Sequence, residues 1–388
     1  MKSLGARASG ARLERMRASA QWVAHGTHPD GARPAGDPGG AFRNRFPVRP
    51  GLRDAQAPRP TLAEFLRNGN RRLPRGPLPA LDPREAWRAP PASGLRATWL
   101  GHSTVLLELH DGRRLVRLLT DPVWGARASP STLLGPRRFQ PAPVALKALP
   151  PLDAVLLSHD HYDHLCMSTA RALAQTGVPW ITSLGVGAHL EAFGVRPDRI
   201  VELDWWQRHR LPGAEVEVVA APAQHFSGRG LKDRNATLWS SLVVRTPRHR
   251  VFFSGDTGLT DQYAGIRSQL GPFDLVLLEV GAHHPAWGDI HLGPENALEA
   301  LELLGGGALL PVHWGTFSLA LHAWDEPAET LLAQAPRRGV HLVMPQLGEA
   351  VEPAQVEHVV PWWRGVERAD APPPAPLSWP RALPFPLD

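Results

Sequence analysis

The most informative segment of the chain passes from a short apolar stretch directly into a dense group of histidines and aspartates: Ala154-Val155-Leu156-Leu157-Ser158-His159-Asp160-His161-Tyr162-Asp163-His164. Imidazole and carboxylate groups are costly to place beside a buried strand unless a metal ion pairs them. The segment therefore predicts a buried strand over residues 154–157 that carries metal ligands at its end.

The spacing within this segment divides the ligands between two sites. His159 and His161 are two residues apart in extended chain, so they point to the same side and can bind one metal. Asp163 and His164 lie past a bend, at the start of the next helix, and face a different direction. They suit a second metal, and the first interpretation of the chain is a metal-dependent hydrolase.

Three further ligands are predicted just beyond other apolar strands, at His225, Asp256 and His313. Loops held by rigid strands are the usual place for functional groups. His225 completes the first site and His313 the second, whereas Asp256 can bridge both metals because a carboxylate has two oxygens. Asp160 and Tyr162 are interpreted as spacers.

Composition limits the kind of metal site and the class of protein. The chain has 388 residues, 43% of them hydrophobic, and one cysteine, Cys166. A single cysteine excludes an internal disulfide and a cysteine-based zinc cluster, so the ligands are nitrogen and oxygen. No apolar run approaches the ~20 residues that a bilayer crossing requires, and no secretory signal is evident. A soluble, cytoplasmic protein is expected.

Proline, glycine and charge divide the chain into four parts. Residues 1–41 are predicted to be a basic, disordered N-terminal arm, because nine basic and three acidic residues lie within 1–50. Residues 42–93 are a proline-rich lead-in packed on the core, with a short helix at Thr61–Arg67. Residues 94–350 form a single catalytic domain, and 351–388 a proline-rich tail. In the tail, Trp362 and Trp363 are expected to pack on the domain, with contact to a membrane as the alternative.

The predicted domain alternates strands and helices. Strands are expected at Ala97–Leu109, Leu115–Leu119, Ala154–Ser158, Trp180–Thr182, Val216–Ala220, Trp239–Val244, Val251–Ser254, Leu275–Glu279, Ala308–Val312 and His341–Met344. Helices are expected at Ser168–Gln175, Gly187–Phe193, Pro294–Leu304 and Pro327–Ala335. This pattern favours an α/β protein with sheet layers covered by helices.

The sequence resembles the metallo-β-lactamase superfamily, whose H-x-H-x-D-H signature is present at 159–164. It is further similar to the branch of N-acylphosphatidylethanolamine-hydrolysing phospholipases D. Motifs carrying that resemblance include Thr98-Trp99-Leu100-Gly101-His102-Ser103-Thr104, Leu119-Thr120-Asp121-Pro122, Gly135-Pro136-Arg137-Arg138-Phe139, Gly255-Asp256-Thr257-Gly258 and His313-Trp314-Gly315-Thr316-Phe317. They cover roughly residues 42–350.

The resemblance implies a four-layer αβ/βα sandwich that binds two zinc ions, with iron or manganese as alternatives. It assigns His159, His161 and His225 to one ion, Asp163, His164 and His313 to the other, and Asp256 to both. It also implies a histidine near the substrate at His291, which could move a proton or donate a hydrogen bond to a phosphoryl oxygen. The alternative role for His291 is a hydrogen bond at the entry of the following helix.

Several other polar residues have weaker assignments. Asp121 and His102 are expected to support the ligands from outside the two sites. His283 and His284 are not assigned as ligands, because adjacent side chains diverge, although their loop is expected to line the pocket. Arg229 is interpreted either as a phosphate contact or as a surface arginine.

The predicted reaction is hydrolysis of an N-acylphosphatidylethanolamine-like lipid to phosphatidic acid and an N-acylethanolamine, by hydroxide that two metals stabilise. Asp256 and His291 are the predicted catalytic residues. A lactone or ester hydrolase on the same fold is the main alternative, and a nuclease or a non-enzymatic metal-binding scaffold are lesser ones. Nucleic acid is not an expected partner, because the chain beyond residue 50 is nearly neutral. A phosphodiester substrate, peripheral membrane contact and a homodimer are expected.

Overall fold

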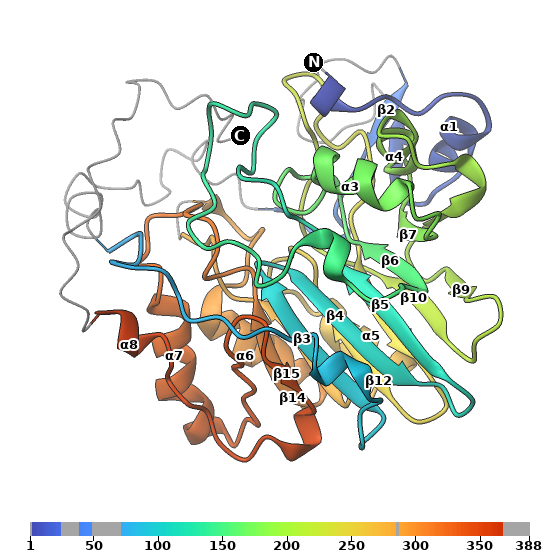
Figure 1. Ribbon diagram of the computed structural model, residues 1–388. Helices are drawn as coiled ribbons and strands as arrows, with labels where there is room; N and C mark the ends of the chain where they lie inside the picture. The colour runs from blue at the N-terminus through green and yellow to red at the C-terminus, as the bar shows by residue number, and fades with distance from the viewer. Residues whose placement is uncertain (1, 25–38, 49–70, 285–286, 368–388) are drawn as a thin grey trace.

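The computed structural model describes residues 2–24, 39–48, 71–284 and 287–367 (Figure 1). Within these ranges the first large sheet has seven strands in the order β15-β3-β4-β5-β6-β7-β8. Their bounds are Ala350–Val351 (β15), Leu95–Gly101 (β3), Thr104–His110 (β4), Leu115–Thr120 (β5), Ala154–Leu157 (β6), Trp180–Ser183 (β7) and Ile200–Leu203 (β8). The strands β5 to β8 are parallel, so their carboxyl ends lie at one edge.

The second large sheet has six strands in the order β14-β13-β12-β11-β10-β9. Their bounds are Ala308–Val312 (β14), Leu275–Glu279 (β13), Arg250–Phe253 (β12), Ser241–Arg245 (β11), Glu217–Ala221 (β10) and Arg208–Arg210 (β9). Here β12, β13 and β14 are parallel. A two-stranded sheet joins Trp22–Ala24 (β1) to Gly40–Phe42 (β2).

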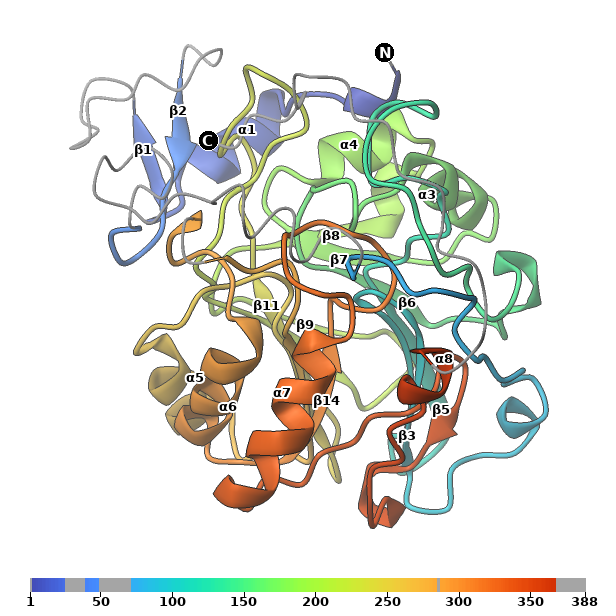
Figure 2. The same cartoon turned by 90° about the vertical axis from the view of Figure 1, so that its left-hand side faces the viewer.

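Helices cover the outer faces of the two large sheets (Figures 1 and 2). Those beside the seven-stranded sheet are α3 (Met167–Ala174) and α4 (Gly187–Ala192), and those beside the six-stranded sheet are α5 (Gln262–Leu270), α6 (Gly293–Leu304) and α7 (Glu326–Gln334). The predicted four-layer αβ/βα sandwich is therefore confirmed.

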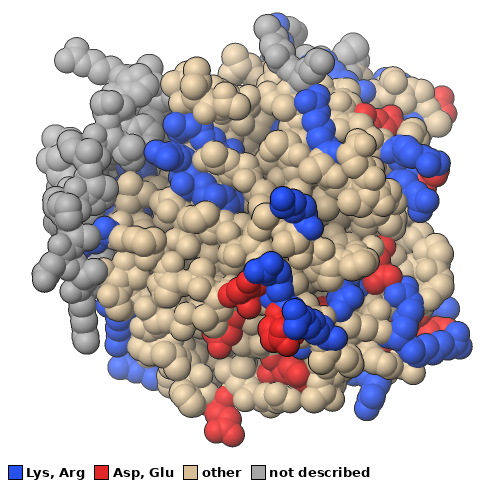
Figure 3. Space-filling view, viewed as in Figure 1, with Lys and Arg blue, Asp and Glu red and all other residues tan. Residues whose placement is uncertain are grey.

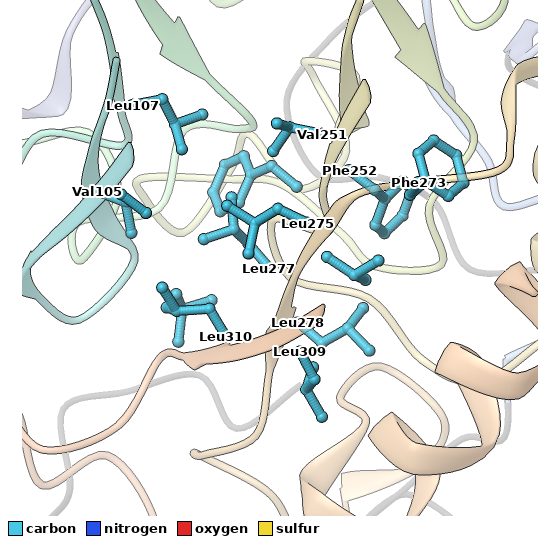
Figure 4. Packing of buried hydrophobic residues seen from close by; sticks show 14 of the residues in the cluster. Val105, Leu107, Val251, Phe252, Phe273, Leu275, Leu277, Leu278, Leu309 and Leu310 are labelled. Carbon is cyan, nitrogen blue, oxygen red and sulfur yellow. The ribbon is translucent and has the colours of Figure 1, made fainter. Parts of the chain in front are cut away.

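Alternating side chains connect the layers. In β6, Leu156 points into the core between the sheets, whereas Val155 and Leu157 pack toward α3 and α4. Figure 4 shows the core between the sheets, where side chains of β4 lie opposite Leu275 and Leu277 of β13 and Leu310 of β14. Because both faces of β6 are buried, the strand is held rigidly, and so is the start of the segment that follows its carboxyl end.

One predicted strand is in fact two. The stretch Ala97–Leu109 was expected to be a single strand, but it turns back at His102 to form the hairpin of β3 and β4. Gly101 and His102 have φ values of 110° and 53°, a conformation that breaks an extended strand. The turn lacks the usual Asn-Gly type of signal, so the apolar residues on both sides look continuous in the sequence.

The other elements differ mainly at their ends. The predicted helix at Pro294–Leu304 is α6, and it stops at Gly305, whose φ is 90°. The prediction of a strand at His341–Met344 is wrong, because this segment makes only an isolated bridge from Leu342 to Leu309. The predicted helix at Thr61–Arg67 lies outside the described residues. Strands β8 and β9 and helix α5 were not predicted.

The first part of the N-terminal arm is ordered, contrary to the prediction for residues 1–41. Helix α1 (Gly10–Arg17) packs Met16 into a cluster with Leu184 and Trp239. Arg12 Nε donates to Glu202 Oε2 at 2.6 Å, and a second nitrogen of Arg12 donates to Glu191 at 2.7 Å. Composition alone suggested a solvated tail because these carboxylates are distant in sequence. Residues 25–38 lie outside the described part.

The lead-in and the tail pack on the domain where they are described. Trp87 of the lead-in is buried beside the seven-stranded sheet. Trp362 and Trp363 belong to the main core, with Trp363 fully buried, so they pack on the domain rather than face a membrane. Within the described ranges, no helix has the length and apolar character needed to cross a bilayer.

Candidate metal centre

The seven predicted ligands come together at one edge of the two sheets. His159, His161, Asp163 and His164 follow β6, His225 follows β10, Asp256 follows β12 and His313 follows β14. Two groups of potential metal-binding atoms hold all seven, His159–His161–His225–Asp256 and His102–Asp163–His164–His313. Two smaller groups among the described residues overlap with them, Asp121–His159–His164 and Asp256–Glu279–His291. The predicted division between two sites therefore agrees with the geometry, and His102 joins the second group.

In the first group, ring nitrogens of three histidines face one another. His161 Nδ1 lies 2.9 Å from His159 Nε2 and 3.1 Å from His225 Nε2. The other nitrogen of His225 is 2.9 Å from the carbonyl of Ile290, to which it can only donate. A neutral imidazole has one N–H, so His225 Nε2 carries a lone pair. The chemistry of this donor set fits a divalent cation.

The same reasoning fixes the tautomer of His159. Its Nδ1 is 2.9 Å from Ser158 Oγ, whose hydroxyl donates to Asp121 Oδ2 at 2.6 Å. Because the serine proton is already committed, His159 Nδ1 donates and Nε2 holds the lone pair. His161 Nδ1 could donate to one neighbour but not to both, so the three nitrogens fit a shared metal better than a hydrogen-bonded cluster.

In the second group, carboxylate and imidazole atoms alternate. His164 Nε2 and His313 Nε2 lie 3.1 and 3.2 Å from Asp256 Oδ1, and His313 Nε2 is 3.2 Å from Asp163 Oδ2. The other oxygen of Asp256 faces the first group, at 3.8 Å from His159 and 3.7 Å from His225. Asp256 thus directs one oxygen to each group, as a bridging ligand requires.

Charges and burial prepare these groups for a cation. Burial lowers the pKa of His159 and His225 well below the usual imidazole value, so both rings are neutral ligands. Burial alone would raise the pKa of Asp256, but His164 and His313 hold it well below its usual range. Burial alone would lower the pKa of His313, but Asp256 and Asp163 raise it to about 10. Without a metal, the proton on His313 offsets the negative charge of Asp163 and Asp256. A divalent cation can replace that proton.

Asp121 orients ligands of both groups, as predicted for a supporting residue. Its Oδ2 is 2.6 Å from His164 Nδ1 and accepts the Ser158 hydroxyl, while its Oδ1 accepts the Ser158 backbone N–H at 2.8 Å. Through Ser158 the same carboxylate reaches His159. Such partners fix the tautomer and the ring orientation of a ligand.

His102 was predicted only as an outer support, yet it lies within the second group. Its Nε2 is 3.0 Å from Asp163 Oδ2. The backbone N–H donates to Thr316 Oγ1 at 2.7 Å, and the carbonyl accepts the backbone N–H of His313 at 3.1 Å. The hairpin turn therefore ties one ligand-bearing loop to another. In the sequence, Gly101 was the available sign of a tight turn that brings His102 to the second group.

Asp160 and Tyr162 are not spacers. Asp160 is 1% exposed, accepts the Gly228 N–H at 2.9 Å and the Thr237 hydroxyl at 3.0 Å, and lies 3.4 Å from His189 Nε2. Tyr162 donates its hydroxyl to the carbonyl of Arg229 at 2.5 Å. Both residues anchor the ligand segment to a loop about seventy positions away, which spacing alone does not reveal.

Arg229 is a structural residue rather than a phosphate contact. Its side chain is buried and donates to the carbonyls of Asp160 and Leu165. The guanidinium also lies 4.0 Å from the centre of the Tyr162 ring. These contacts fix the backbone within the ligand segment, at Asp160, and directly after it, at Leu165.

His291 stands at the border of the first and second groups. Its Nδ1 is 2.9 Å from Glu279 Oε2, and its ring centre is 5.0 Å from that of His225 and 5.6 Å from that of His313. Glu279 also accepts the backbone N–H of Leu292 at 3.2 Å, so the carboxylate, rather than His291, supports the entry of α6. His291 therefore lies beside ligands of both groups, where it could act on a bound substrate.

The pair of adjacent histidines stays outside both groups. The ring of His283 stacks on His322, with ring centres 4.8 Å apart, and His284 lies near Trp287. Next to His313 is a small cavity of about 10 Å³, and its lining includes Arg72, Phe139, Phe317, His322 and Trp324. Its volume is about that of one water molecule.

Comparisons with known proteins agree with this geometry. The model of a family described as a β-lactamase superfamily domain matches residues 116–314. An uncharacterized protein of Mycobacterium tuberculosis is 47% identical over 329 residues, 84% of this chain and 86% of its own length. A protein of Caenorhabditis elegans named N-acyl-phosphatidylethanolamine-hydrolyzing phospholipase D 1 is 35% identical over 275 residues, 67% of this chain and 76% of its own length.

Solved structures support the fold alone. A metallo hydrolase from the hyperthermophilic archaeon Ignicoccus hospitalis superimposes with a TM-score of 0.51 at 21% identity, over 66% of this chain and 97% of that one. At this identity the likeness concerns the arrangement of sheets and helices, not the substrate.

Proposed function

Because the chain belongs to the metallo-β-lactamase superfamily and is a metal-dependent hydrolase, we propose that it cleaves phosphodiesters with two zinc ions, as a phospholipase of D type. The observation that carries the proposal is Asp256, which directs one oxygen to each ligand group. Two-metal centres of this kind suit in-line displacement at phosphorus. The name of the C. elegans relative supports N-acylphosphatidylethanolamine-like lipids as the substrate class.

The residues that would hold the metals follow from the two groups. His159, His161 and His225 would hold one zinc ion and Asp163, His164 and His313 the other, with Asp256 shared. When bound, the two ions lower the pKa of water and offset charge that develops on the phosphoryl oxygens. The protein contributes a rigid, buried frame, because Asp121 fixes the rings of both groups.

His291 is the proposed proton donor at the leaving group. Glu279 holds its Nδ1 at 2.9 Å, so Nε2 is the atom available to a substrate. Burial alone would lower the pKa of His291, but the Glu279 carboxylate raises it, which favours the protonated ring near neutral pH. A protonated imidazole can donate a hydrogen bond or a proton to the departing oxygen.

A direct test combines metal analysis with a substrate panel. Protein loaded with two equivalents of zinc should release an N-acylethanolamine and phosphatidic acid from N-acylphosphatidylethanolamine. Asp256→Asn should bind less zinc and lose at least about a hundredfold in turnover, because a bridging ligand contributes more than a supporting one. The exposed Asp198 offers a matched control, Asp198→Asn, that should behave as the wild type.

The panel also separates the alternatives. Turnover of lactones or carboxylic esters without turnover of any phosphodiester would replace the proposal with an ester hydrolase on the same fold. Protein that binds no zinc, iron or manganese would instead be a scaffold without hydrolytic activity.

A further inference from the structure

Exposed leucines lie on two loops that pack beside the ligand segment after β6. Within the described residues, five large hydrophobic side chains are exposed, and three of them are Leu133 (80%), Leu134 (58%) and Leu231 (82%). Single exposed apolar residues are ordinary on a protein surface, but a group of them marks a contact site. We call these three residues the leucine face.

The two loops of the leucine face are joined by the N-terminal segment. Ser3 Oγ donates to the carbonyl of Pro130 at 2.8 Å, three residues before Leu133. The carbonyl of Ser3 accepts from Arg229 Nη2 at 2.9 Å, two residues before Leu231. Figures 1 and 2 show both loops at the end of the molecule that carries the N-terminus. The N-terminal segment therefore joins the two loops that carry the three leucines.

The charge around the leucine face is positive. The loops and the joining segment carry exposed basic side chains at Arg7, Arg137, Lys232 and Arg234. Asp233 is the one acidic residue within 3–9, 127–137 and 228–234, and its oxygens accept the backbone N–H groups of Arg229 and Gly230. In Figure 3 basic side chains are spread over much of the face, including its upper left part, whereas acidic ones lie mainly below the centre and along the right side.

The leucine face borders the ligand segment on two sides. Arg229, in the loop of Leu231, donates to the carbonyl of Asp160, within the ligand segment, and to that of Leu165, directly after it. Ala128, in the loop of Leu133 and Leu134, packs in a cluster with Cys166 and Tyr162. Whatever binds the leucine face is thus held next to the metal centre.

We propose that the leucine face is a docking surface for a lipid bilayer that contains anionic headgroups. Apolar side chains on loop tips, surrounded by lysine and arginine, can enter the headgroup region while the cations contact anionic lipid. A flat protein interface, by contrast, needs a broad buried patch rather than three projecting side chains. The inference rests on the proposed lipid substrate, because docking here would place the metal edge beside the lipid headgroups.

The test is sedimentation of the zinc-loaded full chain with vesicles, scored by bound protein and without any activity readout. Vesicles of phosphatidylcholine with phosphatidylglycerol should bind the wild type better than vesicles of phosphatidylcholine alone, and added salt should weaken this binding. The triple variant Leu133→Ser/Leu134→Ser/Leu231→Ser should lose at least about tenfold in partitioning, because its loop tips no longer enter the apolar region.

A matched control replaces exposed apolar residues elsewhere, Leu81→Ser/Val360→Ser, which should bind as the wild type does. Equal binding of the triple variant and the wild type would overturn the inference. The inference would also fail if the wild type bound no vesicles but formed a dimer that the triple substitution disrupts. The leucine face would then bind a second copy of the chain. Vesicle binding that depends on the leucines, without phosphodiester turnover, would uphold the docking surface and reject the proposed reaction.

Discussion

At the scale of single residues, Asp121 is the side chain on which both ligand groups depend. It accepts from His164 Nδ1 at 2.6 Å and, through Ser158, fixes His159. In Asp121→Asn an NH2 group replaces one carboxylate oxygen, so the residue loses either its contacts to His164 and the Ser158 hydroxyl or the one to the Ser158 backbone N–H, and it also loses the charge that holds the His164 proton. We expect zinc to bind about 10- to 100-fold more weakly, measured by competition with a chromophoric chelator.

A second buried aspartate provides the control for Asp121. Asp111 is 1% exposed and accepts the backbone N–H groups of Arg113, Arg114 and Glu215, away from the ligands. Asp111→Asn should lower the melting temperature and leave the zinc affinity unchanged. If both variants bind zinc equally well, Asp121 does not orient the ligands.

A substitution at His291 tests proton transfer separately from metal binding. Because its Nδ1 is occupied by Glu279 and it is not among the seven predicted ligands, His291→Asn should keep the zinc content of the wild type. Turnover of the phosphodiester should fall by about 10²- to 10⁴-fold, the range for loss of a general acid. His209→Asn on β9 is the control. A loss of zinc in His291→Asn would instead make His291 a ligand.

The residues that the sequence predicted and those it missed differ in how local their signals are. His159 and His161 stand directly after a strand, so period-two geometry and apolar context were sufficient to group them. Asp160 and Tyr162 looked like spacers because their partners, Gly228 and Arg229, are nearly seventy positions away. A long-range hydrogen bond leaves no periodic pattern in the sequence.

At the scale of elements, one carboxylate attaches the C-terminal helix α8 (Arg364–Glu367) to α7. Glu329 accepts from Trp363 Nε1 at 2.7 Å and from Arg364 at 2.7 and 2.6 Å. The hydrogen bond from Arg364 lowers the pKa of Glu329. A lowered carboxyl pKa stabilises the folded state above the unfolded pKa, and this stabilisation is lost as pH falls through the folded value.

We therefore expect α8 to detach at acid pH before the domain unfolds. Hydrogen exchange of residues 360–367 should accelerate as pH falls, after correction for the intrinsic rate, and Glu329→Gln should show the faster exchange at neutral pH. Glu299→Gln on α6 is the matched control. Exchange of 360–367 that is unchanged in Glu329→Gln would show that Trp362 and Trp363 hold the helix without the carboxylate.

Strand and helix positions were predictable where periodicity was strong and local. β13 and β14 have the predicted bounds, because each is a short apolar run closed by polar or glycine-rich segments. The β3–β4 turn was missed because its turn residues are flanked by apolar strands on both sides. Helix α1 was missed because Arg12 finds its carboxylate partners only in the folded chain. Charge composition cannot distinguish such a docked segment from a solvated one.

At the scale of the whole molecule, the candidate metal centre lies at the edge where loops from the two large sheets meet. His159, His161, Asp163 and His164 follow a strand of the seven-stranded sheet, whereas His225, Asp256 and His313 follow strands of the six-stranded sheet. Each metal would therefore bind ligands from both sheets. Binding that requires the two sheets to be assembled stabilises the folded state by mass action.

Removal of the metals should consequently lower the melting temperature of the whole domain, not only its activity. Free zinc at a thousandfold over its dissociation constant stabilises a folded protein by about 4 kcal/mol, which corresponds to a shift of roughly 5 °C for a chain of 388 residues. Calorimetry before and after chelation measures this shift, and added zinc should reverse it. In Asp256→Asn chelation should shift the melting temperature much less, because its zinc is already weakly held. An identical melting temperature with and without metal would mean that the core between the sheets, rather than the ions, holds them together.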